Sequence, residues 1–273
     1  MISEKSRGFL LLLLLGGLIG GFFYWRTGWK ISEPGNSLSE QLPKNPPSAT
    51  LSSTVKYPVA AESNLQAGST RSADHLRLPA LDESDLSIEK SLKEWFGQLA
   101  LEKIFNLQGF IRRLVITVDS AMGKRPGPAN SSVFQSVDGQ FQATRSGKEL
   151  SLSLKNYQRY LPLVTLLNKV DAKKLGMIYT HFYPLFQAAF RDLTPQGYFN
   201  DRLIEVIDEL LDAPEPSGAI GLVLESVYYK FADPLFESRS NGQKIILRIG
   251  IANELAVKVK LREIREVFVH FSR

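Results

Sequence analysis

The chain has 273 residues, of which 44% are hydrophobic and 22% charged, and its 33 basic and 28 acidic side chains leave a formal net charge of +5. These values are typical of a globular protein, and so small a charge, without a clustered basic field, argues against a nucleic-acid partner. The absence of cysteine excludes disulfides, thiolate nucleophiles, thiolate zinc sites and a lipid-modified N-terminal cysteine.

An uncharged segment near the N-terminus, residues 9–25, predicts a membrane anchor. Its 17 residues would form a helix of about 25 Å, and the basic residues on both sides can cover the difference to a bilayer core of about 30 Å. The alternative is a cleaved secretory signal, which ends in small residues, whereas this segment ends in bulky aromatic ones. We therefore expect residues 1–30 to hold an N-terminal tail and a single, uncleaved transmembrane helix.

The orientation of this helix is not decided by charge, because two basic residues lie on each side of it. The short N-terminal tail favours an N-terminus in the cytoplasm and a domain outside it. In a bacterium with two membranes this predicts a single-pass protein of the inner membrane with its domain in the periplasm.

Four glycines in the anchor form two overlapping G-x-x-x-G spacings: Gly16, Gly17, Gly20 and Gly21. Such spacings let two membrane helices approach closely, so a homodimer through these residues is one interpretation. The other is that glycine is simply common in membrane helices.

Residues 31–75 predict a disordered linker, because they are rich in Pro, Ser, Asn, Thr and Gly and have no persistent apolar periodicity. Residues 76–273 then form the soluble domain. Its first helix can be capped by Asp82, Ser84 or Asp85 and ends at a predicted break, Gly97. A second helix is expected from apolar residues at helical spacing between positions 104 and 122.

The rest of the domain is expected to be helical apart from one hairpin. Residues 140–145 and 148–154 alternate polar and apolar around Ser146-Gly147, the only clear strand signal. Asn200 is expected to cap one helix, Asp233 to cap another, and Pro184 to bend or split a third. Together with these, the predicted helices of this part span about 160–170, 171–193 (with Pro184), 200–211 (starting at Asn200), 241–249 and 253–269. The fold class is therefore mainly α: a transmembrane helix, a disordered linker, and a compact multi-helix domain with one small β-hairpin.

No catalytic, cofactor-binding or metal-ligating residue is predicted. The chain has no G-x-S-x-G elbow, phosphate-binding glycine loop, H-x-x-x-H spacing or D-x-D-x-D-G loop. Of three histidines, only His181 lies well inside the domain, and a packed histidine among aromatic residues is its simpler interpretation. Paired carboxylates, as in sugar cleavage, need no sequence motif and stay open.

Two charged groups are candidates for a binding role. Arg112 and Asp119 lie two turns apart beside an apolar helix face, where they could line a groove or form a structural ion pair. The C-terminal region is basic and could contact an acidic partner, lipid headgroups or anionic cell-wall polymer; its alternative is a solvated helix face. The residues proposed for this basic surface are Lys244, Arg248, Lys258, Arg262 and Arg265.

Several short motifs follow one another through the domain. They occupy residues 78–85, 111–113 with 118–119, 157–160, 183–185, 201–203, 231–234 and 243–250. Their succession, over about residues 78–267, resembles a bacterial family of membrane-anchored proteins known only as a domain of unknown function. The resemblance implies a proteobacterial inner-membrane protein with a periplasmic helical domain, and it brings no activity or ligand. One departure is Leu161, where that family tends to place an acid.

The sequence thus favours an anchored periplasmic module that acts by interaction and helps to organise the envelope, without a cofactor. Its partner would be an unknown envelope protein or an anionic cell-wall polymer. The alternative is an envelope enzyme that acts on glycan or peptide through carboxylates.

Overall fold

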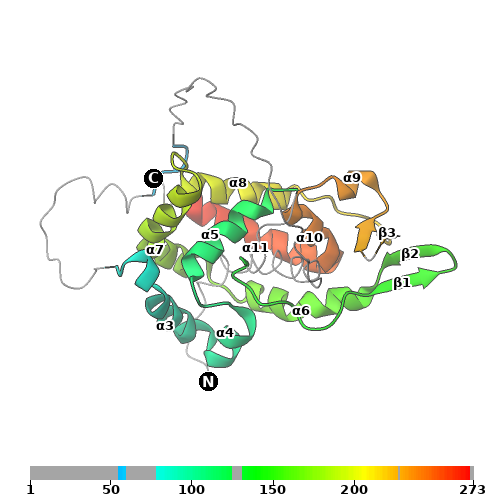
Figure 1. The fold of residues 1–273 in the computed structure, drawn as a ribbon, viewed down its shortest axis with the longest axis horizontal. Coiled ribbons are helices and arrows are strands. Elements are labelled where there is room, and N and C mark those ends of the chain that lie inside the picture. The colour runs from blue at the N-terminus through cyan, green and yellow to red at the C-terminus, as the bar shows by residue number, and fades with distance from the viewer. Residues whose placement is uncertain (1–54, 60–77, 125–130, 227, 271–273) are drawn as a thin grey trace, which may run out of the picture.

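A computed structural model of the chain describes residues 55–59, 78–124, 131–226 and 228–270. Within them it has nine α-helices, one 3-10 turn and four strands. The N-terminal elements are η1 (Leu81–Glu83), α3 (Asp85–Phe96), α4 (Gln98–Ile104), α5 (Phe110–Ala121), β1 (Ala143–Ser146), β2 (Glu149–Leu152) and α6 (Leu154–Asn168). They are followed by α7 (Ala172–Leu193), α8 (Phe199–Leu211), β3 (Gly221–Glu225), β4 (Tyr228–Phe231), α9 (Pro234–Glu237), α10 (Asn241–Ile249) and α11 (Ile251–His270). The mainly helical fold class is confirmed (Figure 1).

The predicted anchor and most of the predicted linker lie outside the described residues. Among the helices that are described, none combines the length and the apolar character needed to cross a bilayer. The anchor therefore stays a prediction from the sequence.

The second predicted helix is in fact two, α4 and α5. The chain leaves α4 at Phe105 in an extended conformation and enters α5 through Gly109, whose φ of 63° is left-handed. Asp85 accepts hydrogen bonds from the backbone N–H groups of Gly109 and Phe110 at 2.7 and 3.1 Å. Asp85 therefore caps α5 from a distance instead of its own helix, which periodicity alone cannot reveal. Pro184, which was expected to bend or split a helix, does not split it: it lies within the continuous helix α7.

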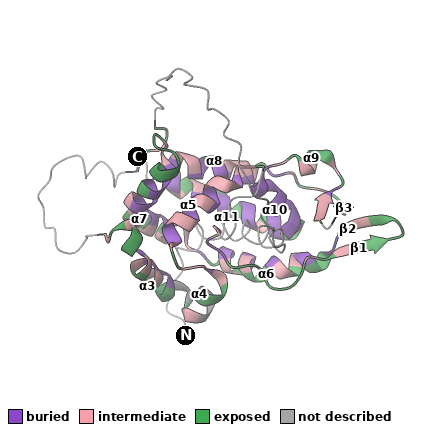
Figure 2. Ribbon diagram, viewed as in Figure 1, coloured by how far each residue is buried: buried purple, intermediate pink, exposed green. Residues whose placement is uncertain are grey.

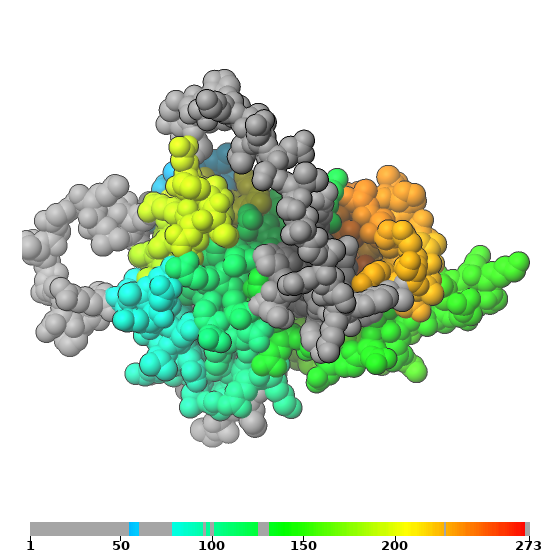
Figure 3. All heavy atoms as spheres, viewed as in Figure 1, coloured from blue at the N-terminus to red at the C-terminus, as the bar shows by residue number. Residues whose placement is uncertain are grey.

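The sheet is larger than predicted. The hairpin of β1 and β2 around Gly147 is confirmed, but its second strand also pairs with β3, which pairs in turn with β4, all antiparallel. The second hairpin was missed: its strands are four and five residues long, and β3 has the sequence GLVLE, with three apolar residues in succession and no alternation. The sheet lies at one end of the molecule, where β1 and β2 project from the helical body (Figure 3).

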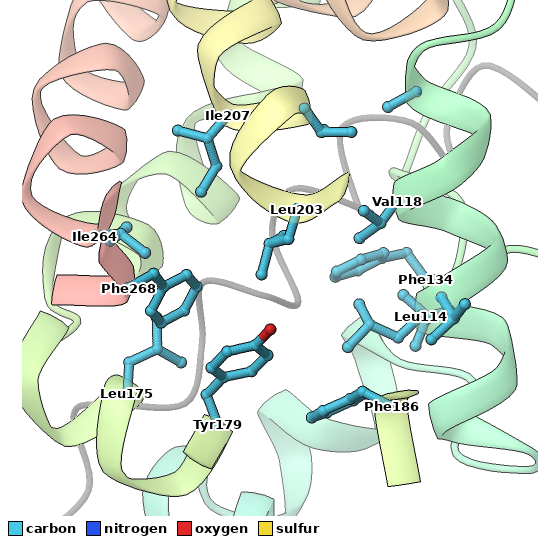
Figure 4. Packing of buried hydrophobic residues seen from close by; sticks show 14 of the residues in the cluster. Leu114, Val118, Phe134, Leu175, Tyr179, Phe186, Leu203, Ile207, Ile264 and Phe268 are labelled. Carbon is cyan, nitrogen blue, oxygen red and sulfur yellow. The ribbon is translucent and has the colours of Figure 1, made fainter. Parts of the chain in front are cut away.

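The main core lies between α5, α7, α8 and α11 (Figure 4). Tyr179 of α7 stacks on Phe268 of α11 with ring centroids 4.6 Å apart, and on Phe186. The short helix α10 passes through the interior, and all nine of its residues are buried (Figure 2). These helices position the start of α8, where the candidate site lies.

Candidate peptide-binding site

A short piece of the predicted linker, residues 55–59, lies against the N-terminal turn of α8, about 140 residues later in the chain (Figure 1, blue). We call these residues the linker segment. Its last side chain, Val59, is 1% exposed and belongs to the main core. Tyr57 is half-buried, and the other three side chains are exposed. The segment thus inserts one side chain fully and presents mainly its backbone to the domain.

Three side chains at the start of α8 bind that backbone: Tyr198, Asn200 and Asp201. We call them the α8 site. The carboxylate of Asp201 accepts the N–H groups of Lys56 and Tyr57 at 2.9 and 2.8 Å, one on each oxygen. Hydrogen bonds to a charged acceptor are shorter and stronger than neutral ones. Asp201 therefore holds two successive peptide groups in one orientation.

The other two members of the site bind the next peptide groups. The hydroxyl of Tyr198 accepts the N–H of Val59 at 2.7 Å, and the amide of Asn200 donates to the carbonyl oxygen of Tyr57 at 2.8 Å. With the segment in place Asn200 is 0% exposed, and this hydrogen bond satisfies its buried amide.

A network within the domain holds the site in place. Asn200 also accepts a hydrogen bond from the hydroxyl of Tyr179 at 3.0 Å. Gln187, which is 1% exposed, accepts the N–H of Phe199 and donates to the carbonyl of Gly197, both at 2.8 Å. The turn into α8 is also tight, because a Cβ at Gly197 would lie 2.6 Å from the ring of Phe190.

Two tyrosines beneath the site, Tyr179 and Tyr183, each donate a hydrogen bond to a side-chain amide oxygen. Burial raises the pKa of Tyr179 and of Tyr183 far above the ordinary value for a phenol. Both hydroxyls therefore stay protonated; Tyr183 donates to the oxygen of Gln187 at 2.9 Å. This fixes the orientation of the Gln187 amide and, through it, the turn into α8.

Helix α11 borders the linker segment through Arg265, one of the predicted basic residues. Its hydrogen bond with Asp208 raises the pKa of Arg265, and Tyr57 contributes in the same direction. The second bond of the pair, from Nη2 to Asp208, is 3.1 Å long. Arg265 therefore lies beside the site as half of an ion pair.

The predicted pair of Arg112 and Asp119 does not form. Arg112 bonds to Asp82 at 3.2 Å and to Asp192, while Asp119 bonds to Arg202 of α8 at 2.8 Å. Seven residues along a helix separate two side chains by about 10 Å, so partners on neighbouring elements are closer. Each residue thus forms an ion pair with another element, and the predicted pairing of the two with each other was wrong.

The predicted basic surface needs a similar correction for its two residues on α10, which are both buried. The ammonium of Lys244 bonds to the carboxylate and the carbonyl of Glu237, both at 3.2 Å. The guanidinium of Arg248 lies 4.9 Å from the centre of the Phe231 ring, and burial lowers the pKa of Arg248. Both cations therefore join α10 to the sheet end of the molecule and are largely shielded from solvent.

On α11, Lys258 is 2% exposed and Arg262 is exposed. Lys258 bonds to Glu254 at 2.9 Å, to Glu215 at 2.8 Å and to the carbonyl oxygen of Ala213 at 2.6 Å. We call Glu215, Glu254 and Lys258 the α11 charge cluster. With three of its five residues buried and Arg265 paired, the basic surface does not exist as predicted.

The described part of the chain shows neither a metal site nor a pair of carboxylates in the cavity beside α10. There, no three acidic or histidine side chains come together as a metal site would require. A cavity of about 260 Å³ lies between α5, α8, α9 and α10, and Glu209 is the sole acidic residue among those described that line it. It therefore lacks the pair of carboxylates that sugar cleavage needs.

The sequence analysis did not single out the α8 site. It assigned Asn200 as a helix cap, but the capping position is Tyr198, and the Asn200 amide binds the linker segment instead. A signal was present: Asn200 and Asp201 are two capping-type residues at the start of one helix, where one suffices.

A family model described as a protein of unknown function (DUF3014) matches residues 110–265, more than half of the chain. The chain belongs to this family. No curated protein and no solved structure matches it. The expected resemblance to a family of unknown function is thereby confirmed, and the DUF3014 match runs from α5 into α11. The α8 site lies within the matched residues, whereas the linker segment lies outside them.

Proposed function

We propose that the chain is a single-pass membrane protein of the bacterial envelope whose DUF3014 domain acts as an interaction module. The observation that carries this proposal is the α8 site, where side chains of the domain bind the backbone of an extended segment. Binding of an extended chain through its peptide groups is a recurring mode of protein recognition.

The envelope location in this proposal comes from the apolar residues 9–25 and the short tail before them. An alkaline phosphatase fused after Arg273 should be active, and a fluorescent protein that matures only in the cytoplasm should stay dark. The opposite result would place the domain in the cytoplasm.

The partner that fits best is a protein. A cell-wall polymer was expected to bind the basic surface, and three of the five cations of that surface, Lys244, Arg248 and Lys258, are buried. The glycine spacings in the anchor still allow the module to act as a homodimer.

The interaction role can be tested by photo-crosslinking in native membranes. A crosslinking residue at Glu205, which follows Asp201 by one helical turn and is half exposed, should capture a protein upon irradiation. The same residue at Arg145, exposed on the distant β1–β2 hairpin, is the matched control. Equal labelling from both positions, or none from either, would count against a specific interaction at α8.

A further inference from the structure

The contacts of the linker segment depend on its backbone much more than on its sequence. Between Lys56 and Val59, every residue that has a backbone N–H donates it to the α8 site, and Pro58 has none. The bound carbonyl, that of Tyr57, also belongs to the backbone. Any extended chain can offer these groups, so their recognition sets no strict requirement for side chains.

Val59 sets the strictest requirement for a side chain, while Tyr57 is half-buried beside Arg265. Val59 is almost fully buried in the main core, whereas Lys56 and Pro58 are exposed. A ligand for this site therefore needs a compact aliphatic residue at the position of Val59. A proline suits the position just before it. Proline has no backbone N–H, so the site needs no hydrogen-bond acceptor at that point.

The site is built by the domain and not by the segment. Asn200 is held by Tyr179, and the turn that carries the site is held by Gln187. None of these hydrogen bonds involves the linker segment. A binding site whose side chains are held in this way needs little reorganisation when its occupant changes.

We propose that the α8 site is a peptide-binding site for an extended segment of a partner protein, and that the linker segment is an intramolecular occupant which this partner displaces. This inference rests on the proposed interaction role. The partner's segment is extended, with a proline followed by valine or a similar aliphatic residue. The linker segment competes with the partner from within the same chain. It therefore lowers the apparent affinity of the α8 site for the partner's segment.

The proposal can be tested with the full-length chain in detergent and a fluorescent peptide of residues 52–62 as the probe. Val59→Asp should empty the site, because a carboxylate cannot enter the apolar core. We expect this variant to bind the peptide at least about tenfold more tightly than the unaltered chain, as it would if the segment occupied the site nine-tenths of the time. Adding Asp201→Ala to it should abolish binding.

The matched control is Val55→Asp, which introduces the same charge in the same segment at a side chain that is 40% exposed. Its affinity for the peptide should equal that of the unaltered chain. If Val59→Asp binds no more tightly than this control, the segment is not a displaceable occupant and the proposal fails.

Amide hydrogen exchange on the unaltered chain gives a test that needs no substitution. The amides of Lys56, Tyr57 and Val59 should exchange more slowly than those of the free peptide, yet faster than the core of α7. Exchange as fast as in the free peptide would mean that the segment does not dock. Exchange as slow as in α7 would mean that it leaves only on global unfolding. Either result overturns this site assignment, whereas specific crosslinks obtained in membranes would leave the interaction role standing.

Discussion

The α8 site and the α11 charge cluster both place polar groups in the interior, but they satisfy them differently. In the α11 charge cluster, Lys258 finds Glu254 one turn earlier on its own helix, and its other partners precede β3. At the α8 site, Asn200 and Asp201 bind a segment about 140 residues away in the chain. We call the first arrangement closed, because its partners all lie within the helical domain. We call the second open, because its occupant is the segment that we propose a partner displaces.

The largest expected effect concerns the closed arrangement. Lys258→Met should lower the free energy of unfolding by about 3–5 kcal/mol, because it leaves the carboxylate of Glu254 buried without its cation. Combining it with Glu254→Gln should restore part of the loss. Urea unfolding would measure both, with Arg262→Met, an exposed position one turn away, as a control within about 0.5 kcal/mol of the unaltered chain. A loss below about 1 kcal/mol for Lys258→Met would show that the cluster is not closed.

The same cluster should show itself in the pH dependence of stability. Burial raises the pKa of Glu254 above its ordinary 4.5, while the bond to Lys258 acts in the opposite direction and Glu215 in the same one. Between pH 4.5 and the raised value, the folded protein binds more protons than the unfolded chain, so this group's contribution to stability falls as pH rises. The slope from one such group is at most about 1.4 kcal/mol per pH unit.

Unfolding midpoints of the unaltered chain and of Glu254→Gln, measured between about pH 4 and pH 7, would isolate this contribution. The stability of the unaltered chain relative to the variant should decrease with rising pH. An increase would mean that Glu254 is stabilised as a carboxylate, which would reverse the assigned direction.

A smaller effect is expected at the open arrangement. Val59→Ala removes two buried methyl groups, worth about 1–2 kcal/mol if the whole fold depended on them. If the segment leaves by itself, as we propose, the loss in global stability should be about 1 kcal/mol or less, with faster exchange at Lys56 and Tyr57. Val55→Ala should change neither. A loss above about 2 kcal/mol would make the linker segment part of the closed core.

The smallest effects concern the surface ion pairs. Asp119→Ala should cost about 0.5–1 kcal/mol, since its partner Arg202 is 27% exposed, and Arg112→Ala should cost less because all its partners are more exposed. In a double-mutant cycle, Arg112 and Asp119 should be additive to within about 0.3–0.5 kcal/mol, whereas Asp119 and Arg202 should show coupling. Coupling between Arg112 and Asp119 would restore the pairing that was expected from the sequence.

Part of the fold was predictable because the signal is local. Helix α10 has the bounds that were expected, Asp233 caps α9 as expected, and Asp171 caps α7, which was expected to start there. The turn at Gly147 located the first hairpin. Each of these depends on contacts within a few residues, which periodicity and capping rules describe.

The candidate site was not predictable in this way. Asn200 and Asp201 look like ordinary residues of a helix start, and only the approach of residues 55–59 gives them a ligand. The basic surface failed for a related reason. The sequence gives the number of charges in the C-terminal region but not their exposure. The burial of Lys258 depends on Glu254 and on the segment before β3.

The sequence by itself determined most of the helices, the first hairpin and the lack of known catalytic motifs, because these follow from neighbouring residues. Only the tertiary structure decided which charges are buried, which ion pairs form and which side chains bind the linker segment. These outcomes depend on contacts between residues far apart in the chain, whose stability comes from shared burial rather than from local preference. In this protein the residues that bind another segment belong to that second group.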